Sequence, residues 1–291
     1  MTKQKYLPFF LILPGLVLMF SITIYPLLYS IYTSLFSMNL VRLRTPEFIG
    51  LENYLKMFKT PAYVNSWKVT FLFTVLSVAI EFSLGLFLSL MIINILQRRS
   101  IISNVFKTTF PMSMMIPPIV IGWIWRYIYN PSWGLINQVW RMLGGSEITF
   151  LSNPKIALFS VIYVDVWQWT PFFFLVLLTG LTAIPKEPVE AAKVDGATGI
   201  QLLRYLVLPM IKPFILFALL IRVMDSIKVF DTIFMMTEGG PGSVTETITL
   251  FAYRESFRKF EIGQGSAISI MILLLVIIIS QIFIALMSKQ Q

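Results

Sequence analysis

The sequence predicts an all-α, polytopic membrane protein with six transmembrane helices. Of its 291 residues, 57% are hydrophobic and only 13% are charged, and the mean hydropathy is +0.79. This composition is too apolar for a soluble domain with an ordinary core. Six apolar runs are each long enough to cross a bilayer, which takes about 20 helical residues. These runs are residues 7–36, 69–96, 105–128, 156–181, 214–236 and 267–287.

The first run follows directly on the basic start of the chain. Lys3 and Lys5 precede a run of about thirty apolar residues, which exceeds the core of a secretory signal, and no small-x-small cleavage site follows. We therefore expect an uncleaved first helix, kinked near Pro14 or Pro26. A polar loop of mixed charge, residues 39–68, follows it.

The third run, residues 105–128, is the most irregular. Three prolines interrupt it: Pro111, Pro117 and Pro118. Membrane helices tolerate proline where neighbouring helices or local water satisfy the freed carbonyl groups. The run ends on aromatic residues that are typical of a membrane interface: Trp123, Trp125 and Tyr127.

Charged residues lie inside several apolar runs, where each costs roughly 2.5–3.5 kcal/mol on insertion scales. They are Glu81, Asp165, Arg222, Asp225, Lys228 and Asp231. Each therefore needs a partner or water. One interpretation is structural pairing of Arg222 with Asp225, and of Lys228 with Asp225 or Asp231.

The other interpretation is a binding site, because two stripes of residues recur at the helical spacing i, i+3, i+4, i+7. The first stripe is Asp165, Gln168, Trp169 and Phe172, and the second is Arg222, Asp225, Ser226 and Val229. Each combines polar groups with apolar or aromatic surface. This mixture suits a sugar, whose hydroxyl groups need hydrogen-bond partners while its C–H face stacks on aromatic rings.

The segment 184–209 is an extended polar-to-amphipathic stretch between two apolar runs. Pro188 suits the first turn of a helix, which we expect over residues 189–194, with Glu190 near its start, where an anion is favourable. Gly196 predicts a left-handed cap at the end of this helix.

A second helix is predicted after the glycine. Thr198 can cap its start, and Pro209 marks its expected end. The sequence therefore predicts two short helices joined by a glycine turn outside the membrane.

This segment resembles the EAA loop of ABC importer permeases. The residues expected to couple to an ATPase are Glu190, Ala191, Ala192, Asp195, Gly196, Leu206, Leu208 and Pro209. Leu206 departs from the family pattern, which often has Ile there, but keeps the bulk and apolarity. The stretches WIWRYIYNPSWGLIN and TEGGPG also resemble sugar-type permeases.

The resemblance covers nearly the whole chain and points to the carbohydrate branch of the family, the maltose and glycerol-phosphate type. It implies a type I ABC importer permease (MetI-like) fold. Residues 1–36 would form an N-terminal transmembrane helix, and residues 69–287 a core of five transmembrane helices that includes the coupling loop 184–209.

The resemblance also implies the partners and the sugar contacts. Expected partners are a second homologous permease, two ATP-binding subunits, an extracytoplasmic solute-binding protein, a carbohydrate and membrane lipid. ATP and Mg would be bound by the partner subunits, with no cofactor in this chain. Matching Pro171 and Pro209 places the sugar contacts of the maltose-type relative on the two stripes. Arg222 and Asp225 replace neutral or aromatic groups of that relative, which favours a more polar or a charged glycan.

Orientation follows from the even number of spans. Six spans place both termini on the side of the 184–209 loop, and the density of Lys and Arg is higher on that side. The resemblance to an ATPase-docking loop makes that side the cytoplasm, so we expect a multi-pass protein of the bacterial inner membrane with both termini in the cytoplasm.

Several other functions are disfavoured. The chain has no Cys and no His, which removes disulfides, thiol chemistry, the usual general base and the commonest zinc ligand, so we do not expect an enzyme. No G-x-x-x-x-G-K-[ST] loop occurs, so an ATPase of that type must be another polypeptide. The net charge of +9 fits a surface of anionic lipid better than nucleic acid. The alternative is an ion-coupled secondary carrier with Glu81 or Asp165 as its proton site, although such carriers tend to show an internal repeat and none is found.

Overall fold

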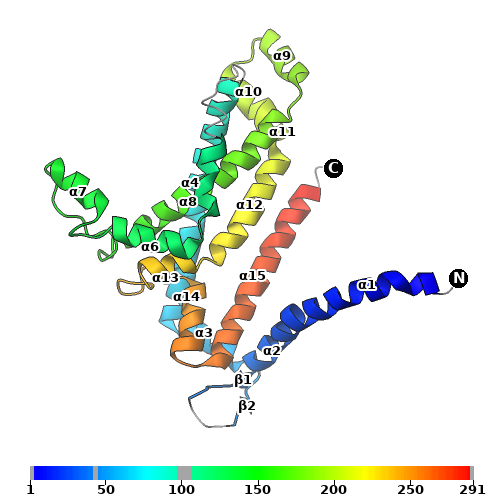
Figure 1. Cartoon of the computed structure of the whole chain (residues 1–291), viewed down its shortest axis with the longest axis vertical. Helices are drawn as coiled ribbons and strands as arrows, with labels where there is room; N and C mark the ends of the chain where they lie inside the picture. The colour runs from blue at the N-terminus through cyan, green and yellow to red at the C-terminus, as the bar shows by residue number, and fades with distance from the viewer. Residues whose placement is uncertain (1–2, 42–44, 97–106, 289–291) are drawn as a thin grey trace. The chain divides into compact units, whose positions relative to one another are not determined.

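The computed structural model describes residues 3–41, 45–96 and 107–288, and these are mostly helical (Figure 1). The first two residues of the predicted third run, 105 and 106, lie outside the described residues. The chain forms two compact units. One comprises Met1–Val64 and Phe251–Leu274, and the other Asn65–Leu250 and Leu275–Gln291.

The first unit begins with a long interrupted helix. It consists of α1 (Lys3–Met19), the π-helical turn η1 (Phe20–Ile24) and α2 (Tyr25–Ser34). Pro26 lies in the first turn of α2 and has no N–H to donate to the preceding turn, which explains the irregular bonding just before it. Of the two prolines proposed to disturb this helix, the irregular turn therefore adjoins Pro26, whereas Pro14 lies within α1.

The predicted loop 39–68 is more ordered than expected. The strands β1 (Phe36–Ser37) and β2 (Glu47–Phe48) pair in antiparallel fashion, so a two-residue ribbon departs from the all-α prediction. It is followed by α3 (Glu52–Lys59) and by the start of α4 (Pro61–Leu96). The buried Asn53 amide donates to the carbonyls of Ser34, at 2.7 Å, and Phe36, at 3.0 Å, and so ties α3 to the end of α2.

The first unit also contains a later segment of the chain, Phe251–Leu274. There the chain passes through α14 (Ile248–Tyr253), the π-helical turn η4 (Arg254–Arg258) and the start of α15 (Ile262–Ser288). Glu255 is buried, and its carboxylate pairs with Lys259 at 2.5 Å. The last predicted run, 267–287, is confirmed as a helix that starts five residues earlier.

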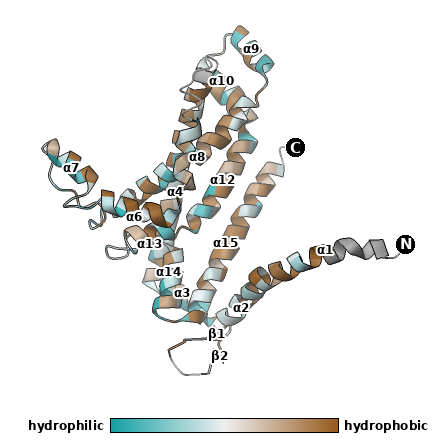
Figure 2. Cartoon of the chain, viewed as in Figure 1, coloured by the Kyte–Doolittle hydropathy of each residue, from teal (hydrophilic) through white to brown (hydrophobic). Residues whose placement is uncertain are grey.

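The core of the second unit is the packing of α8 (Ala157–Thr182) against α4 and α12 (Lys212–Ile227). The fourth predicted run, 156–181, matches α8 almost to the residue. The buried core residues are Val78, Phe173, Leu177, Leu181, Ile211 and Ala218. Hydrophobic residues cover much of α8 and α12 (Figure 2). This unit carries both predicted stripes.

The third predicted run is broken, as its prolines suggest. A 3-10 segment, η2 (Phe110–Met115), precedes α6 (Pro118–Ile128), and the short amphipathic α7 (Leu135–Met142) follows. Between η2 and α6, Ile116 is extended with ψ 128. A residue before proline disfavours the helical region, so Pro117 explains this break.

The fifth predicted run, 214–236, is also not one helix. The helix α12 ends at Ile227. After three residues the short α13 (Asp231–Met236) begins, and it packs on α6. The hydroxyls of Thr247 and Thr249 donate to the carbonyls of Val229, at 3.2 Å, and Ile227, at 3.4 Å. These bonds satisfy acceptors that the helix end leaves open, which explains why the interruption is stable without proline or glycine.

The prediction of six continuous membrane helices is therefore not confirmed. Within the described residues, four helices are long and apolar enough to span a membrane: Leu11–Ser34, Pro61–Ile93, Ala157–Thr182 and Ile262–Ser288. A fifth is added if Gly199–Met210 and Lys212–Ile227, which are bent by 68°, count as one span. Proline and the threonine-stabilised break shorten the remaining segments below spanning length.

A helical hairpin lies between α8 and α12, at one end of these helices (Figure 1). It comprises α9 (Lys186–Val194), α10 (Gly199–Leu202), the π-helical turn η3 (Leu203–Val207) and α11 (Leu208–Met210). The first helix begins three residues earlier than predicted. The second does not end at Pro209 but at Met210, because the π-helical turn shifts the bonding and the missing N–H of Pro209 is accommodated in the first turn of α11.

Candidate functional site

The first predicted stripe lies on α8 and is largely buried. Asp165 and Gln168 are 2% and 1% exposed, whereas Trp169 and Phe172 are half-buried. The Gln168 amide nitrogen donates to the carbonyl of Ile116 at 3.3 Å, in the proline-induced break. Its amide oxygen is buried without a hydrogen-bond partner, so a polar group on this face is left unsatisfied.

The second predicted stripe is divided. Arg222 and Ser226 are buried on α12, whereas Asp225 is exposed and pairs with Lys228 at 3.3 Å. Ser226 donates to the hydroxyl of Thr74 on α4 at 3.1 Å. Val229 lies beyond the end of α12, so it does not share the helix face that the spacing of the stripe predicted.

Arg222 joins three helices. Its Nε and Nη2 donate to the two carboxylate oxygens of Glu81 on α4, at 2.8 and 2.9 Å, and Nη2 also donates to Asp165 on α8. Its guanidinium carbon lies 5.0 Å from the ring centroid of Trp169. A bidentate pair with cation–π contact fixes the plane of the guanidinium.

This arrangement corrects one predicted pairing and confirms another. Arg222 does not pair with Asp225, three residues along its own helix, but with Glu81 and Asp165. Lys228 does pair with Asp225, while no ion pair joins Lys228 to Asp231 in the described part of the chain. The pairing of Glu81 was missed, although its place in an apolar run signalled the need for a cation.

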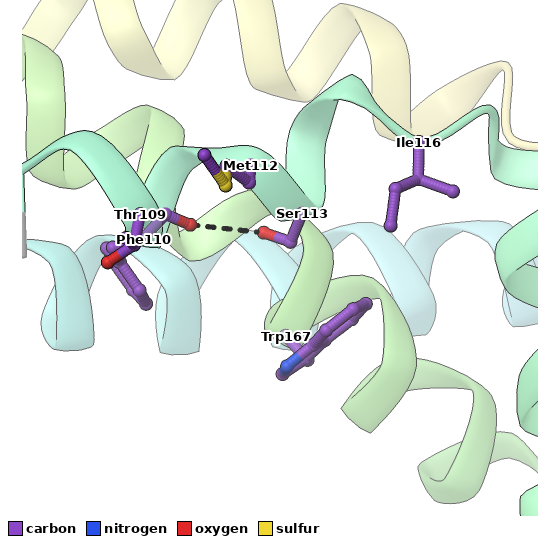
Figure 3. A pocket seen from close by; sticks show the side chains of 6 residues that line it. All are labelled: Thr109, Phe110, Met112, Ser113, Ile116 and Trp167. Atoms are coloured by element: carbon purple, nitrogen blue, oxygen red, sulfur yellow. Dashed lines mark hydrogen bonds between the residues drawn. The ribbon is translucent and has the colours of Figure 1, made fainter.

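A cavity of about 390 Å³ lies between η2 and α8. Its lining residues are Thr109, Phe110, Met112, Ser113, Ile116 and Trp167 (Figure 3). The Ser113 hydroxyl donates to the carbonyl of Phe110 at 3.5 Å, and Trp167 is 41% exposed. Non-helical backbone at membrane depth occurs where it lines a cavity, so the break at the prolines and the cavity explain one another. The prolines were the sequence signal for these residues, which the stripes omitted.

A second cavity, of about 350 Å³, is more polar and lies where α6 and α13 end. It is lined by Arg126, Tyr129, Asn130, Pro131, Leu151, Ser152, Met236, Thr237, Gly240 and Pro241. Arg126 donates to the carbonyl of Met235 at 3.1 Å, and Tyr129 to that of Ser160 at 3.2 Å. The two sequence stretches that resemble sugar-type permeases thus meet at this cavity.

The predicted coupling hairpin has well-formed caps. Gly196 has φ +82, and the N–H groups of Gly196 and Ala197 donate to the carbonyls of Lys193 and Ala192, which is a Schellman motif. Thr198 and Gln201 form a capping box, with bonds of 3.4 and 2.8 Å. The predicted glycine cap and threonine cap are therefore confirmed.

The surface of the hairpin is open. Glu190, Ala191, Asp195, Gly196 and Pro209 are exposed, and Ala192, Leu206 and Leu208 are half-buried. Three large apolar side chains are also exposed: Val194 at 87%, Ile200 at 79% and Tyr205 at 71%. A polar and apolar surface of this kind is suited to a protein partner.

The comparison with protein families decides the class. Residues 82–290 match the model of the binding-protein-dependent transport system inner membrane component. The chain belongs to this family of ABC importer permeases. The match includes the hairpin, so the predicted resemblance is confirmed.

Relatives of the permease carry sugar names. It is 35% identical to the trehalose/maltose transport system permease protein MalF of Thermococcus litoralis, over 95% of this chain and 93% of that one. It is 31% identical to the sulfoquinovosyl glycerol transport system permease protein SmoG of Agrobacterium fabrum, over 97% and 90%. A bacterial alginate ABC transporter, solved with a pentasaccharide-bound periplasmic protein, has a chain with a TM-score of 0.82 at 21% identity, over 97% of this chain and 93% of that one. The permease is therefore similar to carbohydrate permeases, and the alternative of an ion-coupled carrier is not favoured.

Proposed function

We propose that the permease carries a carbohydrate across the bacterial inner membrane while separate subunits hydrolyse ATP. The observation that carries this proposal is the capped hairpin of residues 186–210, whose exposed acidic and apolar residues lie at one end of the α8 and α12 pair. Membership of the ABC importer permease family and the sugar names of its relatives support it.

The sugar path proposed here runs past α8 and the broken third run. The half-buried Trp169 and Phe172 offer aromatic surface, and the unpartnered oxygen of Gln168 offers an acceptor. No charged residue lines the cavity in Figure 3 within the described residues. Because no charge lines this cavity and Arg222 is already paired with two carboxylates, we favour a neutral, polar glycan over a charged one.

The roles of the remaining stripe residues stay proposals. Ser226, Asp225 and Val229 would contact the glycan after α12 moves, since Ser226 is buried against Thr74 in this structure. The division into an N-terminal helix, residues 1–36, and a core, residues 69–287, stays a prediction as well.

The proposed partners are those of a complete importer. The permease would pair with a second homologous permease, contact membrane lipid, and receive sugar from an extracytoplasmic solute-binding protein. Two ATP-binding subunits would hold ATP and Mg and contact the hairpin on the cytoplasmic side, where both termini would also lie. The chain itself would bind no cofactor or nucleic acid, and would act as a permease without enzymatic activity.

Coupling would use the hairpin as a lever. Glu190 would pair with a basic residue of the ATPase, the turn at Gly196 would set the angle between α9 and α10, and Leu206 and Leu208 would seat in an apolar cleft. Closure of the ATPase dimer would then move α8 and α12 between inward- and outward-open states, two arrangements of one body.

The test is a charge reversal at Glu190 in the reconstituted complex. Glu190→Lys should lower ATP-driven sugar uptake at least about tenfold while ATP hydrolysis continues, because losing and inverting one charge-assisted contact costs more than about 1.4 kcal/mol. Glu187→Lys is the matched control, since Glu187 is exposed in the first turn of the same helix, and it should leave uptake nearly unchanged.

Uptake is measured with radiolabelled neutral disaccharides in proteoliposomes, with ATP or with an imposed proton gradient. Normal uptake by Glu190→Lys would remove the lever. Uptake driven by the proton gradient alone would replace the whole proposal with the secondary carrier.

A further inference from the structure

The guanidinium of Arg222 is held from one side by Glu81. Both carboxylate oxygens of Glu81 are engaged, at 2.8 and 2.9 Å, and its side chain is fully buried. Two parallel hydrogen bonds from one edge of the guanidinium determine the plane of this group and its position relative to α4. Arg222 is thus fixed by a residue that is absent from both predicted stripes.

On its other side, Arg222 contacts two stripe residues of α8. It donates to the Asp165 carboxylate, and its charge lies 5.0 Å from the Trp169 ring. Asp165 and Trp169 are four residues apart and so share one helix face. Gln168, beside them, is bonded to the break at Ile116. The orientation of this face of α8 is therefore tied to the Glu81–Arg222 pair.

We propose that Glu81 and Arg222 are positioning residues, which hold Asp165 and Trp169 in the geometry that binds the sugar. Glu81 acts only through Arg222, and it is not among the residues that line the cavity in Figure 3. The inference rests on the proposed function, because it concerns the same sugar path. It differs from a purely structural ion pair, which would hold the helices together without affecting affinity.

The decisive variant is Glu81→Gln, which keeps the size of the side chain and removes one charge from the Glu81–Arg222 pair. In the reconstituted complex, the KM for sugar uptake should rise about tenfold, the equivalent of roughly one hydrogen bond to a charged group. The maximal rate per folded transporter should stay the same. Glu52→Gln is the matched control, because Glu52 forms an exposed pair with Lys56 at 2.9 Å, and its KM should not change.

A conservative variant keeps the test informative if Glu81→Gln does not fold. Glu81→Asp retains the charge but withdraws it by one methylene group, so the KM should rise by a smaller factor. A loss of maximal rate with unchanged KM in these variants would show a merely structural pair and overturn the proposal, as would kinetics identical to the wild type.

A readout without sugar separates this proposal from the proposed function. The chain contains no Cys, so Trp167→Cys introduces a unique thiol on α8, at a position that is 41% exposed. Its rate of labelling by a small maleimide should change severalfold when Glu81→Gln is added, because α8 as a whole is held less firmly once Arg222 is released from Glu81. An unchanged rate would overturn the positioning role. Failure of the wild-type complex to transport any glycan would overturn the proposed function and leave the labelling result valid.

Discussion

The ion-pair partners of Arg222 in this permease could not be predicted from the spacing of charged residues along one helix. The sequence indicates that Arg222 needs an anion, and Asp225 is the nearest candidate along the helix. The structure pairs Arg222 with Glu81 and Asp165, which lie on two other helices. Local spacing cannot reveal such partners, because helix packing brings them together across 141 and 57 positions of the chain.

Removing only one charged residue of the Arg222, Glu81 and Asp165 cluster should lower the free energy of unfolding. Removal of one partner of a buried ion pair costs about 3–5 kcal/mol, since the remaining charge is left uncompensated. Arg222→Ala should therefore destabilise the protein far more than Glu81→Gln or Glu81→Asp, which keep a side chain of similar size beside the guanidinium.

Gly85 supplies a prediction at the same scale. A Cβ atom there would lie 2.5 Å from Cβ of Phe173 and 3.0 Å from the backbone nitrogen of Phe174. Neither atom can move without shifting α8, so Gly85→Ala should destabilise the protein by about 1–3 kcal/mol, the usual cost of overpacking. The measurement is the thermal unfolding of the purified protein in detergent, followed by tryptophan fluorescence.

The control for Gly85 is Gly15→Ala on α1, where no atom lies within 4 Å of the added Cβ. We expect no loss of stability there. Equal melting temperatures for Gly85→Ala and the wild type would contradict the close packing of α4 against α8.

The break in the third predicted run was predictable from its prolines, whereas the break in the fifth was not. The break before Pro117 follows from the proline itself. The break after Ile227 has no proline or glycine, and depends on hydroxyls of Thr247 and Thr249, which reach its carbonyls from later in the chain. Likewise, the caps of the hairpin were predictable from Gly196 and Thr198, whereas the π-helical turn that moves the helix end to Met210 was not.

The turn of the hairpin provides a prediction at the scale of elements. Gly196 has φ +82, which costs a residue with a Cβ roughly 1–2 kcal/mol. Gly196→Ala should therefore weaken binding of the ATPase subunits at least about fivefold, because part of the binding energy must restore the turn. Titration of the purified permease with labelled ATPase subunits measures this effect.

Gly199 is the matched control, three residues away at the start of α10. It has no positive φ and no atom within 4 Å of an added Cβ, so Gly199→Ala should bind the ATPase subunits like the wild type. A similar loss for both variants would mean that the left-handed turn has no part in docking.

At the scale of the whole molecule, composition predicted a helical membrane protein correctly, but not the number of continuous spans. Hydropathy averages over a run and does not register a short interruption inside it. The family resemblance depended on the hairpin and on two turn-rich stretches, which are local in sequence. The cavity beside α8 required the packing of helices and was indicated only indirectly, by the prolines.

The orientation of the permease can be tested with introduced thiols, since the chain has no Cys. Val194 on α9 and Met142 on α7 are 87% and 83% exposed. In cells from which the outer membrane and cell wall have been removed, a membrane-impermeant maleimide should label Met142→Cys and not Val194→Cys. In inverted vesicles the pattern should reverse.

Labelling of Val194→Cys from outside intact cells would contradict the proposed cytoplasmic position of the hairpin, and with it the proposed contact with the ATPase subunits. The variants should be compared at equal expression, with the unsubstituted chain as the background for nonspecific labelling.

The uncovered apolar side chains of the hairpin, Val194, Ile200 and Tyr205, bear on how the importer is assembled. A permease synthesised without its ATPase subunits would expose these apolar side chains to the cell interior. Chaperones and proteases there act on proteins with exposed apolar surface. Docking would hide these side chains and spare the permease from degradation. The contact that we propose for coupling would then also balance the numbers of permease and ATPase subunits.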